Sequence, residues 1–191
     1  MSAGPGPGAE RVAVVLIGHG APALDCPPRL IGELMSLQWG PGSGGHGHHH
    51  LEGRAAELDM TIRSWPRTPQ NDPYKVGLEQ VAAALRPLLP TELLAVGYNE
   101  FCRPTIAEAV EQVLAQGATR ILVIPSMLTP GGVHSEIDIP KTLDHLRQAH
   151  RHARIEYVWP FEPGEVAQLL ASRLDRAAGR AAPASESSRR A

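Results

Sequence analysis

Four short apolar runs, each followed by a longer segment with helical spacing, constrain the fold of this chain most strongly. The runs span 12–18, 92–98, 120–125 and 155–159. They are too short for most helices and rich in Val, Ile and Leu, which is typical of strands buried on both faces of a parallel sheet. The alternation predicts an α/β fold of four βα units with a four-stranded, mostly parallel sheet.

The segments between the predicted strands have the apolar spacing of helices. We expect helices at about 28–37, 74–85, 104–116, from near Asp138, and at 165–175, with a weaker one at 51–65. Asp138 fits the N-cap of the helix that it precedes, and we favour this role over metal ligation.

The ends and one internal run differ in composition from this pattern. The length of 191 residues fits one domain with some residues left over. Residues 1–10 are rich in Gly and Pro, and residues 179–191 are rich in Ala, Ser and Arg, so both are expected to be disordered around a module at 11–178. Residues 40–50 contain only Gly, Pro, Ser and His, a composition that cannot bury a core.

Charge, cysteine count and hydropathy exclude several classes of protein. The formal net charge of −2 offers no electrostatic attraction to nucleic acid. Cys26 and Cys102 form no CxxC pair and no disulfide framework, which favours a reducing compartment. The apolar run at 12–17 is too short to cross a membrane, and Glu10 before it argues against a signal peptide. We therefore expect a cytoplasmic protein without a membrane or nucleic-acid partner.

Three residues of types that commonly bind metals follow the first three predicted strands. His19 follows the first strand directly, Glu100 follows the second, and His134 lies in the Gly-rich loop after the third. The carboxyl ends of parallel strands meet at one edge of the sheet, where ligands bind in such folds. Two imidazoles and one carboxylate suit a divalent Co, Ni, Fe or Zn ion and leave positions open for exchange, unlike a closed structural zinc site. Asp25 is a weaker ligand candidate.

The turn around His19 has a second interpretation. The glycines on either side, Gly18 and Gly20, predict that a bulky group can approach the imidazole closely. The run from Gly18 to Ala23 also fits the loose GxGxxG/A pattern of dinucleotide sites. However, no helix opens at once and Pro22 removes a backbone donor, so we disfavour a nucleotide site.

Three strings of this sequence resemble the sirohydrochlorin chelatase family of the CbiX/SirB type. They are LIGHG near the start, NEFCRPTIAEAV in the middle and IPSMLTPGGVHSEIDIP after the third strand. The resemblance covers roughly 11–37 and 74–172, and it implies a chelatase-like, flavodoxin-like three-layer sandwich formed by a single module. The chain departs from the family pattern at Ala21, where Ser is common, and 38–71 looks like an insertion. The connector at 51–73 fits either a lid or a dimer contact.

The resemblance also implies an activity, which is insertion of Co, Fe or Ni into sirohydrochlorin or a related tetrapyrrole. The enzyme would be a lyase of the sirohydrochlorin cobaltochelatase or ferrochelatase type in cobalamin or sirohaem synthesis. His19 and His134 match the family's metal-binding histidines, and Glu100 matches its acidic residue. The divalent metal is then a substrate, and no organic cofactor is expected. A single module also implies a homodimer that holds the flat macrocycle between two walls.

Other basic and histidine side chains are candidates for substrate handling. The tetrapyrrole's carboxylates need cationic donors, and the nearest ones to the candidate loops are Arg29, Arg103 and Lys141. Four histidines in the Gly-rich run could deliver or buffer the metal, namely His46, His48, His49 and His50. The remaining histidines, His145, His150 and His152, are expected to face solvent.

Two other functions remain open at this point. A metal-binding or metallochaperone module could use the same histidines without catalysing insertion. A ferrochelatase acting on protoporphyrin shares the general fold, but its apolar substrate would need a more aromatic cleft than 4% aromatic residues supply.

Overall fold

A four-stranded sheet forms the centre of the computed structural model, which describes residues 10–39 and 53–179. Its strands are β1 (Val12–Gly18), β2 (Leu94–Tyr98), β3 (Arg120–Pro125) and β4 (Arg154–Tyr157). They lie in the order β2-β1-β3-β4, and every pair is parallel. The predicted α/β class and strand count are therefore confirmed.

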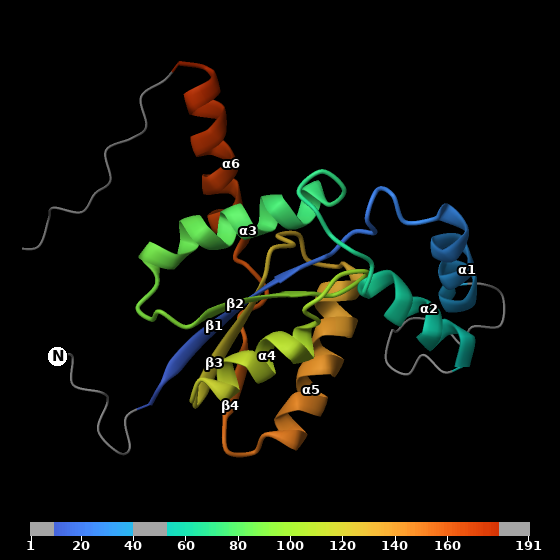
Figure 1. The fold of residues 1–191 in the computed structure, drawn as a ribbon. Helices are drawn as coiled ribbons and strands as arrows, with labels where there is room; N and C mark the ends of the chain where they lie inside the picture. The colour runs from blue at the N-terminus through green and yellow to red at the C-terminus, as the bar shows by residue number, and fades with distance from the viewer. Residues whose placement is uncertain (1–9, 40–52, 180–191) are drawn as a thin grey trace, which may run out of the picture. The chain divides into compact units, whose positions relative to one another are not determined.

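Helices cover both faces of this sheet and give a three-layer sandwich (Figure 1). The alternation of side chains along β1 produces the two cores. Ala13, Val15 and Ile17 pack with α4 (Ile106–Ala115) and α5 (Ile139–Ala149). The side chains that alternate with them, Val14 and Leu16, pack with Leu78 and Ala82 of α3 (Pro73–Leu85), which a short 3₁₀ turn, η2 (Arg86–Leu88), follows.

A third core lies beyond the carboxyl end of β1. It joins α1 (Pro28–Trp39) to α2 (Gly53–Arg63), where Leu34 faces Leu58 and Ile62, and it also holds the side chain of Phe101. The described part of the segment that resembled an insertion, 53–71, is thus packed against the loop after β2. This packing ties α2 to the neighbourhood of Glu100.

Two helix starts near the loops have a local cause. The hydroxyl oxygen of Thr105 caps α4 by accepting a hydrogen bond from the backbone N–H of Glu108. The carboxylate of Glu108 in turn accepts a hydrogen bond from the backbone N–H of Thr105. The helix therefore begins two residues later than Pro104, where the sequence placed it. Before α5, residues His134–Asp138 form a π-helical turn, η3, a rare geometry that often occurs at functional sites.

The chain divides into two compact units, residues 1–159 and 160–191. The described part of the second unit contains α6 (Pro163–Ala177), which a capping box between Glu162 and Glu165 opens. Along α6, Leu169, Leu170 and Leu174 are exposed. None of the helices in the described ranges combines the length and the apolar character that a membrane span needs.

Candidate metal centre

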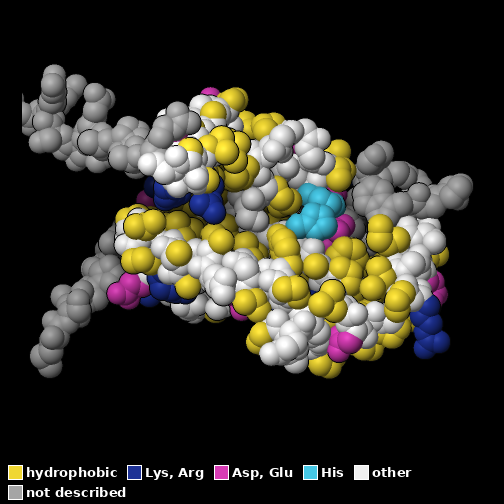
Figure 2. Space-filling model, turned by 90° about the horizontal axis from the view of Figure 1, so that it is seen from above, with side chains coloured by type: hydrophobic (Ala, Val, Ile, Leu, Met, Phe, Trp, Pro, Cys, Tyr) yellow, Lys and Arg dark blue, Asp and Glu magenta, His cyan; other side chains and the backbone are white. Residues whose placement is uncertain are grey.

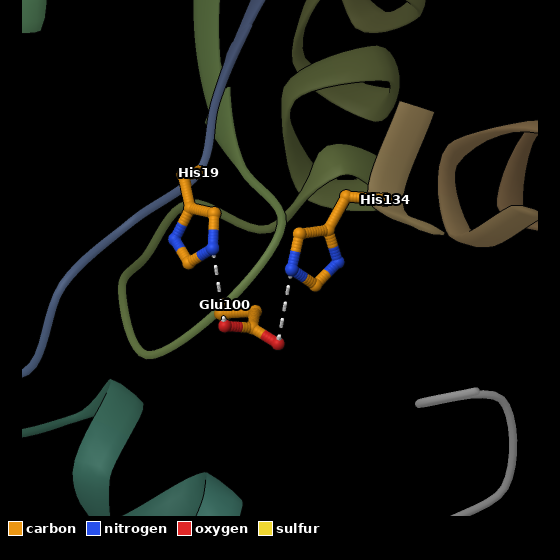
Figure 3. A group of neighbouring side chains, drawn as sticks. All are labelled: His19, Glu100 and His134. Atoms are coloured by element: carbon orange, nitrogen blue, oxygen red, sulfur yellow. Dashed lines mark ion pairs between the residues drawn. The ribbon is translucent and has the colours of Figure 1, made fainter. Parts of the chain in front are cut away.

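The carboxyl ends of β1 and β2 and the turn after β3 bring three predicted ligands together (Figure 3). The Nε2 atom of His19 lies 3.7 Å from Oε2 of Glu100, and Nε2 of His134 lies 3.8 Å from Oε1 of the same carboxylate. The two imidazole rings meet edge to face with their centroids 4.7 Å apart. Glu100 therefore lies between two imidazole nitrogens, one on each carboxylate oxygen.

The Nδ1 atom of His134 is held from behind. It lies 2.7 Å from Oδ2 of Asp138 and 2.9 Å from the side-chain amide nitrogen Nδ2 of Asn99. An ionised carboxylate can only accept, so the ring proton belongs on Nδ1, and the side chain of Asn99 fits this proton once its amide nitrogen and oxygen are exchanged. The lone pair of Nε2 is then directed toward Glu100. Asp138 is at the predicted N-cap position of α5, but its side chain makes no capping hydrogen bond to the helix and contacts His134 instead, so the predicted capping role of the carboxylate is wrong.

His19 has the same arrangement with a different partner. Its Nδ1 lies 2.8 Å from the carbonyl oxygen of Gly20, which also places the proton on Nδ1 and the lone pair on Nε2. The His19 amide donates to the hydroxyl of Tyr74, which fixes the backbone at the strand end. Outer partners of this kind orient ligating histidines and strengthen metal binding.

The loops that carry His19 and Glu100 are bonded to each other. The backbone N–H of Glu100 donates to the His19 carbonyl at 2.8 Å, and the backbone N–H of Asn99 donates to the Gly18 carbonyl at 2.9 Å. Gly20 has φ of +92°, and a Cβ there would lie 1.9 Å from the carbonyl oxygen of Glu100. Glycine is therefore required for the two loops to approach each other this closely.

These contacts correct the prediction about the glycines beside His19. The space next to Gly20 is filled by the backbone of Glu100, and a Cβ on Gly18 would lie 2.3 Å from Leu78 and 3.2 Å from Tyr74. Glycine at both positions therefore allows other parts of the protein to pack closely against the backbone. They do not leave room for a bulky ligand.

Exposure and charge differ across the three candidate ligands. The side chain of His19 is 41% exposed, whereas those of Glu100 and His134 are 8% and 17% exposed. The hydrogen bond to Asp138 raises the pKa of His134 above its ordinary value, burial opposes this rise, and the charge of Glu100 adds to it. A proton therefore competes with a metal ion for this imidazole more strongly than for an ordinary histidine.

The arrangement can hold a divalent ion once its ligand atoms move closer together. Metal–ligand bonds of about 2.1 Å require ligand atoms roughly 3.0–3.4 Å apart, and the three candidate ligand atoms all lie within 4.8 Å of one another, so the spacings need to contract by less than about 2 Å. Two imidazoles and one carboxylate occupy one side of an ion and leave other positions open. Within 10–39 and 53–179, this is the one group of three or more such side chains with its ligand atoms this close.

Figure 2 shows histidine side chains at the surface of the protein, with hydrophobic side chains and an acidic side chain beside them. A groove between α4 and α5 reaches the rear of the centre, where Asn99 and Asp138 line it together with Arg63.

The other predicted site residues lie outside this group. Asp25, the weaker ligand candidate, accepts hydrogen bonds from the side chains of Trp65 and Asn71, which is a structural role. Arg103 is 55% exposed and forms an ion pair with Glu108. Arg29 and Lys141 are exposed on α1 and α5. The histidine run, with His46, His48, His49 and His50, lies outside the described residues.

Of the three histidines expected to face solvent, one does not. His145 and His152 are exposed, but the side chain of His150 is only 19% exposed, with its Nε2 atom 2.6 Å from Glu111. The ring of His152 is 5.8 Å from that of His150.

Two arginines that reach the loop after β2 were not predicted from the sequence. Arg63, at the end of α2, donates to the carbonyl oxygens of Asn99 and Cys102. Arg67 donates to those of Ala21 and Phe101. These partners are 34 to 46 residues away in sequence, so no local pattern could have revealed them.

Comparison with known proteins places the chain in a family. A family model described as CbiX matches residues 70–177, more than half of the chain. A sirohydrochlorin cobaltochelatase of Priestia megaterium is 35% identical over 83 residues, which are 43% of this chain and 27% of that protein. One of Methanopyrus kandleri is 38% identical over 66 residues, 35% of this chain and 46% of that protein. The chain thus matches less than half the length of each of these relatives.

Solved structures have the same fold. SirB from Bacillus subtilis with Fe3+ superposes with a TM-score of 0.53 at 17% identity, covering 87% of this chain and 47% of that one. A CbiX protein from Marinobacter aquaeolei VT8 gives a TM-score of 0.53 at 15% identity, covering 89% of this chain and 99% of that one. At such identities the likeness concerns the fold, which confirms the chelatase-like sandwich. Together with the match over 70–177, it leads to one conclusion: the chain belongs to the CbiX family.

Proposed function

We propose that this protein is a chelatase that inserts Co, Fe or Ni into sirohydrochlorin or a closely related tetrapyrrole. The observation that carries the proposal is the arrangement of two histidine Nε2 atoms on the two oxygens of one buried carboxylate, Glu100. Relatives that are named sirohydrochlorin cobaltochelatase support the substrate and the reaction.

The reaction replaces two pyrrole N–H protons by one divalent ion, so it needs ligands for the ion and a base beside them. In the proposal, His19 and His134 hold the ion through Nε2 while it loses water. Glu100 accepts the pyrrole protons one at a time and passes them to solvent. Because Glu100 lies between the two imidazoles, it is next to the ion, and no other residue is needed as the base.

The substrate would approach from the side of His19, the most exposed of the three ligands. Arg29, Arg103 and Lys141 remain proposed partners for the tetrapyrrole's carboxylates. Arg103 would first have to leave Glu108, so we rank it below the other two. The apolar side chains around the histidines offer a surface on which the flat macrocycle can rest.

We also propose that residues 11–178 act as one module and that two copies form the cleft. The family match covers residues 70–177, which supports the carboxyl-terminal limit of the proposed module. A flat macrocycle held against one wall leaves its second face uncovered, and a homodimer with twofold symmetry would cover it. Sedimentation at assay concentration should show a dimer, and an active monomer would contradict this part of the proposal.

The direct test follows the visible spectrum of sirohydrochlorin with Co(II) and the protein. We expect metal insertion to be faster than the uncatalysed reaction, and His134→Ala to lose the acceleration. A protein that binds Co(II) but accelerates nothing would be a metallochaperone or storage module, the alternative from another class.

The histidine run is a proposed metal-delivery segment. Changing His46, His48, His49 and His50 to serine together should slow insertion when Co(II) is limiting and leave it unchanged when Co(II) is in excess. Equal rates at limiting metal would contradict delivery. This quadruple-serine variant also serves as a background for metal titrations, because it removes four imidazoles that can bind metal on their own.

A further inference from the structure

Two guanidinium groups hold the loop that carries Glu100. The side chain of Arg63 spans this loop, with Nη2 donating to the Asn99 carbonyl at 2.9 Å and Nη1 donating to the Cys102 carbonyl at 3.1 Å. Asn99 and Cys102 lie on either side of Glu100 and Phe101 in the chain. Arg63 is itself fixed by Asp59 one turn earlier on α2, at 2.7 Å, and is 12% exposed.

Arg67 holds both loops of the centre at once. Its Nη1 donates to the Ala21 carbonyl at 2.7 Å, two residues after His19, and its Nη2 donates to the Phe101 carbonyl, one residue after Glu100. The same guanidinium pairs with the buried carboxylate of Asp72 at 2.7 Å. One side chain thus connects the segments that carry two of the three ligands.

The held loop has a conformation that an ordinary residue resists. Phe101 has φ of +54°, the left-handed region, which costs a non-glycine residue about 1 kcal/mol or more. Such a residue persists only when its surroundings fix it. Here its carbonyl is bonded to Arg67, and its side chain packs with Leu58 and Ile62 of α2 in the third core.

We propose that Arg63 and Arg67 are positioning residues that hold His19 and Glu100 in ligating geometry before the ion arrives. This inference rests on the proposed function of the centre as a metal site. Neither arginine touches the candidate ion position, and their guanidinium groups are engaged with backbone oxygens. They act by fixing the backbone on both sides of Glu100 and next to His19, so α2 becomes part of the site's scaffold.

Metal binding separates positioning from a purely structural role. In the quadruple-serine background, Co(II) alone is titrated into Arg63→Ala, Arg63→Lys and Arg67→Lys, well below each variant's melting temperature, with circular dichroism confirming the fold. Arg67→Lys retains a positive charge opposite the buried Asp72, which avoids the cost of an unpaired buried carboxylate. The matched control is Arg54→Ala, because Arg54 lies on the same helix but pairs only with Glu33 and Glu57 in the contacts described.

We expect Co(II) affinity to fall about 10- to 100-fold in Arg63→Ala and Arg67→Lys, as for other changes behind metal ligands. Arg54→Ala should remain within about twofold of the background. Arg63→Lys should resemble Arg63→Ala, because an ammonium cannot form the fork that spans two carbonyls. If Arg63→Ala and Arg67→Lys bind Co(II) as tightly as the background protein does, the inference is wrong, even if their melting temperatures fall. If Arg63→Lys binds Co(II) as tightly as the background protein, the paired hydrogen bonds of the Arg63 guanidinium are not needed.

Failure of the proposed function gives a different result. If His134→Ala binds Co(II) as tightly as the background does, the centre is not the metal site, and the arginine variants have nothing to position. If His134→Ala loses binding while both arginine variants retain it, the centre stands and the positioning role is wrong.

Discussion

Two histidine–carboxylate contacts in this protein differ in what surrounds them. The contact of His150 with Glu111, at 2.6 Å, is much closer than either contact of Glu100 with His19 or His134, at 3.7 and 3.8 Å. Yet the shorter contact uses Nε2 for a single exposed carboxylate, 54% accessible, and has no third ligand atom beside it among the described residues. The longer contacts converge on one buried carboxylate. A short distance therefore does not identify a metal site.

The orientation of the rings explains the difference. At the centre, Asp138 and the Gly20 carbonyl take up Nδ1 of the two histidines, so both Nε2 lone pairs remain directed at Glu100. At His150, the nitrogen that would bind a metal is already engaged with Glu111. The predictions run from the largest expected effect to the smallest, and the first two use the pair of His150 and Glu111 as an internal control.

Removing the proposed base should have the largest effect. Glu100→Gln retains the side chain's shape but cannot accept pyrrole protons, so we expect insertion of Co(II) into sirohydrochlorin to slow by about 10²- to 10⁴-fold. Glu111→Gln should leave the rate unchanged. Equal rates for Glu100→Gln and the unmodified protein would remove the base from the mechanism.

Removing a ligand should come next. His134→Ala in the quadruple-serine background should weaken Co(II) binding at least about 100-fold, because two ligands remain and one of them is exposed. His150→Ala should change it by less than about twofold. A larger loss in His150→Ala than in His134→Ala, measured by the same titration, would reverse the comparison between the two regions.

Asp138 acts through the ring that it orients. Asp138→Asn should weaken Co(II) binding by about 10- to 100-fold, since the amide no longer fixes the proton on Nδ1 of His134 with a charged acceptor. Asp144→Asn is the matched control, because Asp144 lies on α5, the helix that directly follows Asp138, and pairs with Arg147 at the surface. Equal effects of the two substitutions would show that Asp138 only stabilises α5.

The smallest effect concerns pH. Ligation needs a neutral imidazole, and the hydrogen bond to Asp138 raises the pKa of His134 above 6.5. Co(II) affinity should therefore begin to fall, by about tenfold per pH unit, at a higher pH than an ordinary histidine predicts. In Asp138→Asn the fall should begin at a lower pH. An identical profile in both proteins would exclude this coupling.

The raised pKa of His134 also affects the stability of the metal-free protein, but here low pH is favourable, whereas low pH weakens metal binding. Because the pKa of His134 is raised on folding, its protonated form stabilises the folded state. This stabilisation is fully present below the unfolded value near 6.5 and is lost as pH rises through the raised pKa. Thermal melts of the metal-free protein at several pH values would show it, and His134→Ala should lack it.

The sequence predicted those parts of the molecule that local patterns determine. The bounds of β1 and β3 match the apolar runs at 12–18 and 120–125, because β1 is buried on both faces and β3 alternates buried with partly buried residues, and such strands leave continuous hydrophobic stretches. His19, Glu100 and His134 were predicted because parallel topology alone brings strand ends together. Their meeting around one carboxylate follows from the same rule.

Residues that act over long sequence distances could not be predicted in this way. Asp138 was interpreted as a helix cap because a carboxylate just before a helix usually has that role, and the π-helical turn that directs it at His134 has no sequence pattern. Arg63 and Arg67 bind backbone carbonyls, which every residue type offers, so their partners leave no trace in side-chain identity.

The most direct measurement is anomalous diffraction at the cobalt edge from crystals of the quadruple-serine protein grown with Co(II). We predict one strong peak about 2.1 Å from Nε2 of His19, Nε2 of His134 and a carboxylate oxygen of Glu100. A cobalt ion bound at His150 and Glu111, with no peak among His19, Glu100 and His134, would contradict the assignment of the metal centre.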